Sequence, residues 1–272
     1  MSPSDASASG LIDVQGTPLY YESAGTGDTL LLIHAGVADS RMWDDQFAAF
    51  ATHYRVIRCD LRGFGRSHVP NTPFANHDDI AGLLDALGIE RAHVVGISFG
   101  GRNAIDFALA YPERVDRLVL GAPSLSGNPP SPELLEFGDE EDALVEAGDL
   151  HAAADLNVRM WVDGPHRTPE QVSADVRQRV HTMQYDAFNV PLPEGFDVIP
   201  LEPRAVGRLA ELQAPTLVIA GDQDHGSVQA VAGRIAQEAP NARAVIMAGV
   251  AHMLNMEQPD TFNRLVLDFL AE

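Results

Sequence analysis

Short apolar runs bounded by turn residues alternate along the chain with longer stretches in which apolar residues recur every three or four positions. The run Thr29–His34 is continuously apolar, as a strand buried on both faces requires. Two shorter runs, Leu11–Val14 and Pro18–Glu22, flank a Gln-Gly-Thr turn and predict a hairpin. Further runs of the strand type lie at Arg55–Asp60, Ala92–Ile97, Val115–Gly121, Thr216–Gly221 and Ala242–Met247.

The stretches between these runs have the spacing of amphipathic helices. Helices are predicted over Trp43–Ala51, Asp78–Leu87, Phe99–Ala110, Ser227–Glu238 and Pro259–Leu270. Because strands alternate with helices, we expect the α/β class, with a mostly parallel eight-stranded sheet flanked by helices.

The alternation is interrupted between residues 123 and 209. This stretch begins with prolines and acidic residues, and helical patterns follow around Leu150–Trp161 and Pro169–Tyr185. It predicts a helical cap inserted over the carboxyl ends of the strands, where ligands bind in open α/β sheets. The alternative is a set of ordinary helices with no gating role. The expected organisation is therefore a core of residues 1–122 and 210–272, with residues 123–209 as the cap.

Composition narrows the classes of partner. The 272 residues include 18 basic residues, all of them arginine, and 39 acidic ones, which gives a formal net charge of −21. Such a chain repels a phosphate backbone and an anionic membrane surface, so we expect neither nucleic acid nor membrane as a partner. With 45% hydrophobic residues it has enough apolar surface for one large folded domain, alone or as a homodimer.

The cellular compartment is predicted from two absences. The single cysteine, Cys59, cannot form an internal disulfide, and the polar first nine residues lack the apolar core of a secretory signal. No apolar stretch approaches the roughly 18 residues that a membrane-spanning helix needs. We therefore expect a cytoplasmic protein.

A candidate nucleophile lies between a predicted strand and a predicted helix. Residues 96–100 read Gly-Ile-Ser-Phe-Gly and match G-x-S-x-G, the motif of a sharp turn that exposes a reactive serine. The small residues on either side of Ser98 avoid clashes in this turn. The alternative is that Ser98 only caps the helix.

A serine hydroxyl needs a positioned base, and the base needs an orienting acid. His252 follows the last predicted strand, so its loop returns to the sheet edge where Ser98 lies. Two acids follow the strand before it, and we expect Asp224 to orient His252 while Asp222 braces the turn. The order Ser98, Asp224, His252 then forms a catalytic triad.

An anionic intermediate at Ser98 requires hydrogen-bond donors. The N–H of Phe99, directly after the serine, is the first candidate. The second comes from the loop after the run that ends at His34, with Gly36 preferred and Val37 as the alternative if the register differs by one. His34 is expected to brace this loop rather than to act as a base.

Beyond the triad, several motifs resemble those of the α/β-hydrolase fold family. Residues 60–67 match its D-x-R-G-x-G-x-S turn, Trp43 lies nine residues after His34, and residues 257–262 resemble its E-x-P-x-x-F segment. Within the family the chain is most similar to serine esterases and to 3-oxoadipate enol-lactonase-like hydrolases. This resemblance implies hydrolysis of a small or medium carboxylic ester or lactone through an acyl-enzyme.

The chain also departs from the family pattern at four positions. Ala35 stands between the histidine and the glycine of the oxyanion loop, and Phe99 replaces the methionine that often follows the nucleophile. Arg102 either pairs with an acidic neighbour or binds an anionic substrate. His225 is either a surface residue or part of the contact with the cap.

The sequence offers several candidates for the substrate pocket and more than one possible activity. Candidates for an apolar pocket, which could equally form the core of the cap, are Val37, Met160, Trp161, Met183, Tyr185 and Phe188. No metal motif, nucleotide loop or G-x-G-x-x-G helix is present, so no metal and no cofactor are expected. The alternatives to an esterase or lactonase are a carbon–carbon bond hydrolase of the meta-cleavage type, a perhydrolase or haloperoxidase, and a slowly hydrolysing ligand receptor.

Overall fold

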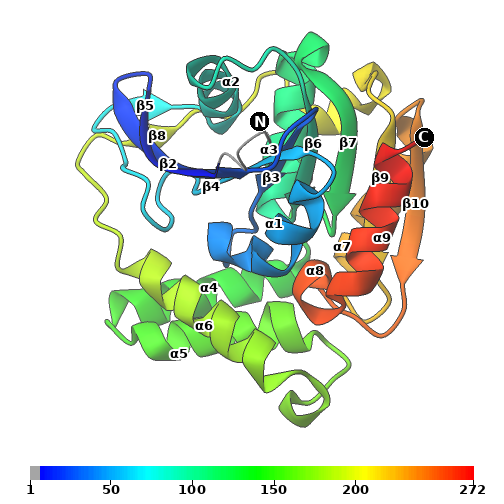
Figure 1. Cartoon of the computed structure of the whole chain (residues 1–272). Helices are drawn as coiled ribbons and strands as arrows, with labels where there is room; N and C mark the ends of the chain where they lie inside the picture. The colour runs from blue at the N-terminus through cyan, green and yellow to red at the C-terminus, as the bar shows by residue number, and fades with distance from the viewer. Residues whose placement is uncertain (1–6) are drawn as a thin grey trace.

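A twisted eight-stranded sheet forms the centre of the protein in the computed structural model, which describes residues 7–272 (Figure 1). The strand order is β1-β2-β4-β3-β6-β7-β9-β10. Only the pairs β1–β2 and β2–β4 are antiparallel, which confirms the mostly parallel sheet. The strands are β1 Ala8–Val14, β2 Thr17–Ala24, β3 Thr29–Ile33, β4 Arg55–Cys59, β6 Ala92–Ile97, β7 Val115–Gly121, β9 Thr216–Gly221 and β10 Ala242–Met247.

Helices cover both faces of this sheet. The helices are α1 Asp44–Ala51, α2 Asn76–Ala86, α3 Phe99–Ala110, α4 Pro132–Glu146, α5 Leu150–Asn157, α6 Ala174–Phe188, α7 Gly226–Glu238, α8 Leu254–Glu257 and α9 Pro259–Leu270. In β3, Leu31 and Ile33 pack with α2 and α3 in one apolar core, whereas Leu30 and Leu32 pack with α1 and α9 in the other. The continuous apolar run is therefore explained by burial on both faces.

The predicted hairpin and helix positions agree with the structure to within a few residues. Gln15 and Gly16 both adopt positive φ, 53° and 83°, as a tight two-residue turn between β1 and β2 requires. Two helices were missed: the four-residue α8, and α4, whose apolar residues Leu134, Phe137 and Leu144 lie at helical spacing but are only partly buried. The helix expected from Pro169 begins later, at Ala174, after a separate short turn at Pro169–Gln171.

Helices α4, α5 and α6 form a group of their own between β7 and β9. They lie together on the side toward which the arrowheads of β7 and β10 point (Figure 1). The segments before α4 and after α6 pack against the sheet. Leu125, Leu201 and Leu209 lie in the same apolar core as Leu31 and Ile33 of β3. A small second sheet joins Pro73–Phe74, β5, to Asp197–Val198, β8.

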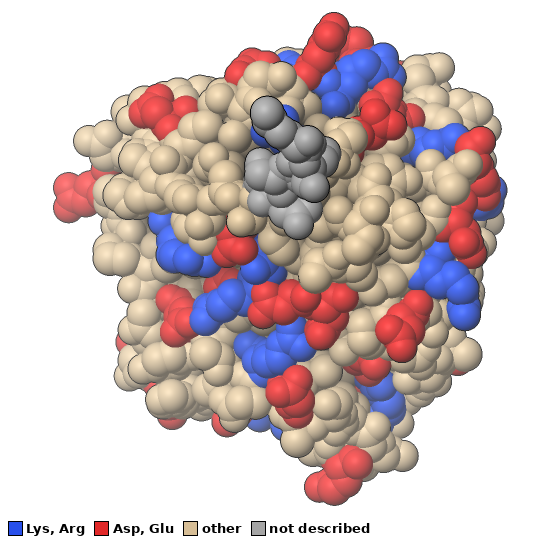
Figure 2. Space-filling model, viewed as in Figure 1, with Lys and Arg blue, Asp and Glu red and all other residues tan. Residues whose placement is uncertain are grey.

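Ion pairs fasten α6 to the start of α1. Arg179 contacts Asp45 at 2.8 Å, and Arg41 contacts both Asp186, at 2.7 Å, and Asp39. Figure 2 shows arginine and acidic side chains interspersed over this face rather than gathered in patches of one sign. The arginines on this side therefore lie beside acidic partners, which limits the local repulsion between carboxylates.

The only cysteine lies at the end of β4. Cys59 is 1% exposed and pairs with Tyr21 of β2 and Ile33 of β3, and burial raises the pKa of its thiol. It is thus a small apolar core residue. None of the described helices is both long and apolar enough to span a membrane.

Candidate active site

Ser98 occupies a strained turn between β6 and α3. Its φ of 56° and ψ of −116° lie in a region that residues with a side chain rarely adopt. A Cβ atom at Gly96 would collide with the carbonyl oxygen of Gly100, and one at Gly100 would collide with those of Ile33 and His34. The two glycines of the motif are therefore required by close backbone contacts, and they allow Ser98 to project from the sheet edge.

Asp224 and His252 meet at the same edge of the sheet. Asp224 Oδ2 lies 2.8 Å from His252 Nδ1, and the two residues are 1% and 3% exposed. The other carboxylate oxygen accepts a hydrogen bond from the N–H of His225. Gly221 makes the approach of the two loops possible, because a Cβ there would collide with the carbonyl oxygens of Val250 and Ala251.

Asp222 has a different partner. Its Oδ1 accepts a hydrogen bond of 2.7 Å from the N–H of Gly249, and its own N–H donates to the carbonyl of Met247. It braces the turn after β10 and does not contact His252. The structure thus places Asp224, and not Asp222, against the imidazole.

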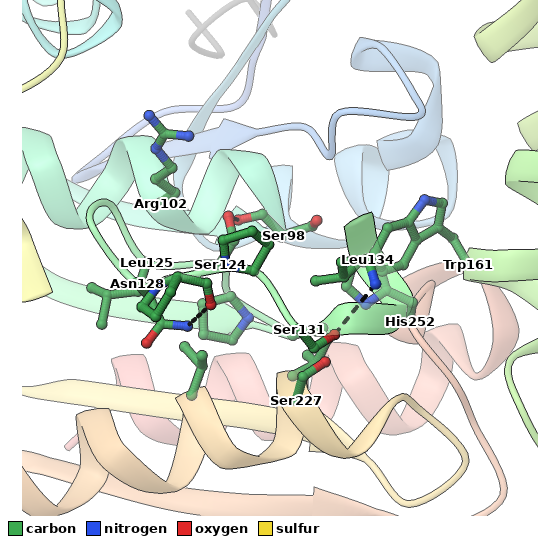
Figure 3. A pocket seen from close by; sticks show the side chains of 16 residues that line it. Ser98, Arg102, Ser124, Leu125, Asn128, Ser131, Leu134, Trp161, Ser227 and His252 are labelled. Carbon is green, nitrogen blue, oxygen red and sulfur yellow. Dashed lines mark hydrogen bonds between the residues drawn. The ribbon is translucent and has the colours of Figure 1, made fainter. Parts of the chain in front are cut away.

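Ser98 and His252 line one cavity of about 210 Å³ (Figure 3). Among residues 7–272, His252 Nε2 has no hydrogen-bond partner although it is buried, and no hydrogen bond joins it to Ser98. With Asp224 bonded to Nδ1, Nε2 is the ring nitrogen left to exchange a proton inside the cavity.

The two candidate oxyanion donors are neighbours. A Cβ at Gly36 would lie 3.3 Å from the Cβ of Phe99, so the loop after β3 packs directly against the start of α3. Within the described chain, neither the Gly36 N–H nor the Phe99 N–H donates to a protein acceptor. The alternative residue, Val37, has its side chain buried in the apolar core.

His34 braces this loop, as expected. Its Nε2 accepts a hydrogen bond of 2.9 Å from the N–H of Leu61, and its Nδ1 lies 2.8 Å from the carbonyl of Ala35. Asp60 completes the support by accepting hydrogen bonds from the N–H groups of Ser40 and Arg66. The D-x-R-G-x-G-x-S turn therefore holds the oxyanion loop in place.

Only one of the predicted apolar pocket residues lines this cavity. Trp161 does, and its ring lies 4.5 Å from the ring of His252. Met183 and Val37 are buried in the core, and Tyr185 stacks on His151 at the surface of the helical group. Met160 and Phe188 are likewise absent from the cavity wall. A helical pattern identifies apolar positions but does not say which way each one faces after folding.

The cavity wall instead contains polar residues that the sequence analysis did not select. They are Ser124, Asn128, Ser131 and Ser227, beside the apolar Leu125, Leu134, Val228 and Val231. Residues 122–131 directly follow β7, at the sheet edge where ligands bind, and that position was the one available signal.

Arg102 and His225 can now be placed. Arg102 lines the cavity, and its Nε is buried without a hydrogen-bond partner. No carboxylate of the described residues lies within 4 Å of its guanidinium, so the expected acidic partner is not found. His225 is 4% exposed and therefore not a surface residue. Its Nε2 lies 3.0 Å from the carbonyl of Met160 and its Nδ1 lies 3.1 Å from Glu133 of α4, at the contact with the inserted helices.

A buried ion pair supports the loop that carries His252. Glu257 accepts a hydrogen bond from the N–H of Ala251 and pairs with Arg167, which also donates to the carbonyls of Val162 and Asp163. Burial raises the pKa of the Glu257 carboxyl, although Arg167 and the N–H of Ala251 oppose this shift. No group of three or more metal-ligating side chains is found in the part of the chain that the structure describes.

Comparisons with known proteins show the family of this chain. Residues 28–259 match the sequence model of a family described as alpha/beta hydrolase fold. The chain is 33% identical to a 2-hydroxy-6-oxononadienedioate/2-hydroxy-6-oxononatrienedioate hydrolase of Burkholderia vietnamiensis, over 93% of this chain and 90% of that protein. It is 28% identical to the carboxylesterase YbfK of Bacillus subtilis, over 89% and 80%.

A solved structure extends the likeness to three dimensions. The enol-lactonase of Burkholderia xenovorans superimposes with a TM-score of 0.75 and 27% identity, over 97% of this chain and all of that one. The family match covers most of the chain, and the sheet order, the turn at Ser98 and the inserted helices fit it. The chain therefore belongs to the α/β-hydrolase fold family.

Proposed function

We propose that this protein is a serine hydrolase that cleaves a small or medium carboxylic ester or lactone through an acyl-enzyme on Ser98. The observation that carries the proposal is the pair Asp224–His252, whose free Nε2 faces the cavity that Ser98 also lines. Asp224 holds the imidazole in the orientation that a general base needs. The names of the esterase and lactonase relatives support the same class of reaction.

The reaction proceeds in two steps. Ser98 Oγ attacks the carbonyl carbon while His252 Nε2 takes its proton, and the N–H groups of Gly36 and Phe99 stabilise the oxyanion. One such donor contributes about 3–4 kcal/mol. The carbon–oxygen bond to the alcohol then breaks, and His252 protonates the leaving oxygen. Water, deprotonated by His252, attacks the acyl group and releases the acid and Ser98.

We also propose that residues 123–209 serve as a cap over this site. Ser131 and Leu134 of the α4 region and Trp161 of the segment after α5 all reach the cavity wall. Because α4 buries none of its residues against the sheet, its position depends on contacts such as that of Glu133 with His225. The cap then supplies one wall of the pocket rather than part of the catalytic group.

A carbon–carbon bond hydrolase is the second candidate. It is favoured by the relative at 33% identity, which is named as a 2-hydroxy-6-oxononadienedioate/2-hydroxy-6-oxononatrienedioate hydrolase. In that reaction the carbonyl at the reacting centre is a ketone, and the bond that breaks joins two carbon atoms. The same three residues would be required.

Two experiments test these proposals. A fluorophosphonate probe should label Ser98 in the folded protein and should fail to label Ser98→Ala. A panel of p-nitrophenyl esters of increasing chain length, lactones and vinylogous diketones then separates the two reactions. Turnover that survives in Ser98→Ala would contradict both. Turnover of the diketones alone would favour the second candidate.

A further inference from the structure

The cavity beside Ser98 contains buried polar atoms that the protein itself does not satisfy. Within residues 7–272, Arg102 Nε, Ser227 Oγ and His252 Nε2 are buried without a hydrogen-bond partner, and all three side chains line this cavity. His252 Nε2 is explained by the proposed proton transfer. Ser227 has no role in that chemistry, and its hydroxyl therefore needs a separate explanation.

Ser227 is placed by the same loop that places the catalytic acid. It is the second residue of α7, three residues after Asp224, and Figure 3 shows it in the part of the wall with Ser131 and His252. A buried hydroxyl without a partner is unfavourable, because it has lost its hydrogen bonds to water without replacing them. Such a group is retained at a binding site when the ligand supplies the missing partner.

The position of the cavity indicates which part of a substrate lies there. Ser98 and His252 line it, whereas the oxyanion residues Gly36 and Phe99 do not. A carbonyl oxygen bound by Gly36 and Phe99 points away from this space. The group that receives the proton from His252 points toward it, and in ester hydrolysis that group is the alcohol.

We propose that Ser227 is a specificity-determining residue whose hydroxyl donates a hydrogen bond to an oxygen atom in the alcohol part of the substrate. The inference rests on the proposed ester or lactone hydrolysis and narrows it to substrates whose alcohol carries an additional ether, carbonyl or hydroxyl oxygen. A plain alkyl alcohol of the same size leaves Ser227 unpaired and is a poorer substrate.

The neighbouring wall has a matching character. Ser131 Oγ accepts a hydrogen bond from the N–H of Leu134, so its own O–H remains available to a ligand. Asn128 donates only to the carbonyl of the adjacent Pro129. Together with the cavity volume of about 210 Å³, these polar groups among the apolar side chains of the wall fit a short alcohol that carries an oxygen atom.

The test compares 2-methoxyethyl acetate with butyl acetate, which differ only in an ether oxygen in place of one methylene group. We expect the wild-type protein to hydrolyse the ether with roughly tenfold higher kcat/KM, as one hydrogen bond provides. Ser227→Ala should abolish this preference, so that the ratio of the kcat/KM values for the two esters falls to about one. Ser227→Thr, which keeps the hydroxyl, should preserve the preference.

Thermal unfolding provides a second measurement. If Ser227 had a purely structural role, its replacement by alanine would lower Tm. Because Ser227→Ala removes a buried unsatisfied hydroxyl, its Tm should be equal to or about 2 °C above that of the wild type. The matched control is Ser40→Ala, whose hydroxyl is also buried and unpaired but lies outside the cavity. Ser40→Ala should change Tm by the same amount as Ser227→Ala and should leave the preference for the ether-containing ester unchanged.

The proposal is overturned if the wild type shows no preference for the ether, or if Ser227→Ala lowers turnover of both esters equally. A lower Tm with an unchanged preference would also overturn it, because Ser227 would then be structural. Failure of the proposed hydrolysis is distinguishable, since in that case the wild type would turn over neither ester faster than Ser98→Ala does.

Discussion

Asp222 and Asp224 stand two residues apart after β9 and bind different parts of the loop that carries His252. Asp224 accepts a hydrogen bond of 2.8 Å at the imidazole, and Asp222 accepts one of 2.7 Å from the backbone of Gly249. One carboxylate therefore binds the His252 imidazole, and the other holds the turn that precedes this histidine. Exchange of either acid for its amide separates these two roles.

Asp224→Asn should lower kcat about 10⁴-fold, because an amide stabilises the wrong tautomer of His252 and cannot stabilise its positive charge. Asp222→Asn should keep kcat within about threefold of the wild type and lower Tm by about 2–4 °C, since it weakens one hydrogen bond to the turn. Steady-state kinetics and thermal unfolding of both variants provide the measurement. Equal losses of kcat would contradict the assignment.

Trp161 packs its ring against three aromatic rings, those of His252, Phe137 and His225. Its centroid lies 4.5 Å from that of His252 and 5.6 Å from that of Phe137 in α4. We expect Trp161→Ala to lower kcat/KM about tenfold for all esters, because the imidazole loses a packing partner and the cavity widens. Trp161→Phe should stay within about threefold. If the two variants lose the same activity, ring packing is not the cause.

Arg167→Met should destabilise the protein by about 3 kcal/mol at pH 7.5, because the buried carboxylate of Glu257 loses its counter-charge. Burial already raises the pKa of Glu257, and loss of the arginine raises it further. The folded state then holds a proton that the unfolded state releases, so stability falls as pH rises between the unfolded and folded pKa values. The deficit should therefore be smaller at pH 5, as measured by urea unfolding.

The control for this prediction is the double variant Arg167→Met with Glu257→Gln. Its remaining side chain is neutral, so its stability should not depend on pH in this range beyond the dependence of the wild type. A deficit that is the same at pH 5 and pH 7.5 in the single variant would show that Arg167 acts through its bonds to Val162 and Asp163 instead.

His93 should contribute to acid sensitivity. Burial lowers the pKa of this imidazole in β6, where it packs edge-on against Tyr54, so the unfolded state binds a proton more readily than the folded state. Stability should consequently fall as pH drops through the unfolded value near 6.5. His93→Phe keeps the ring and removes the titration. Its stability between pH 7 and pH 5 should decline less than that of the wild type, and an equal slope would exclude His93 as a source.

The sheet and the positions of the candidate site residues could be predicted because both depend on local sequence. A strand such as β3 that is buried on both faces must be apolar throughout, and a serine between β6 and α3 needs glycines on either side. Asp224 and His252 follow neighbouring parallel strands, whose carboxyl ends meet at one edge. The fold class and the order of the site residues follow from these rules.

The cavity wall could not be predicted because it depends on how loops and inserted helices turn. Met183 lies on the same helix as Tyr185, yet one is buried in the core and the other stacks on the outside. Helix α4 keeps its apolar residues only partly buried and lies in the acidic stretch that interrupts the alternation, so the sequence analysis did not identify it. The sequence left open whether His225 is a surface residue. In the structure it is buried and contacts Glu133 of α4.

The single thiol at the end of β4 can report local unfolding of the sheet. Cys59 lies between β2 and β3, and a reagent reaches it only when the middle of the sheet separates. The rate at which a thiol-specific dye reacts with the native protein therefore reports how often that region opens. Because no second cysteine reacts with the dye, the labelling rate of Cys59 measures the opening of the sheet in each variant above.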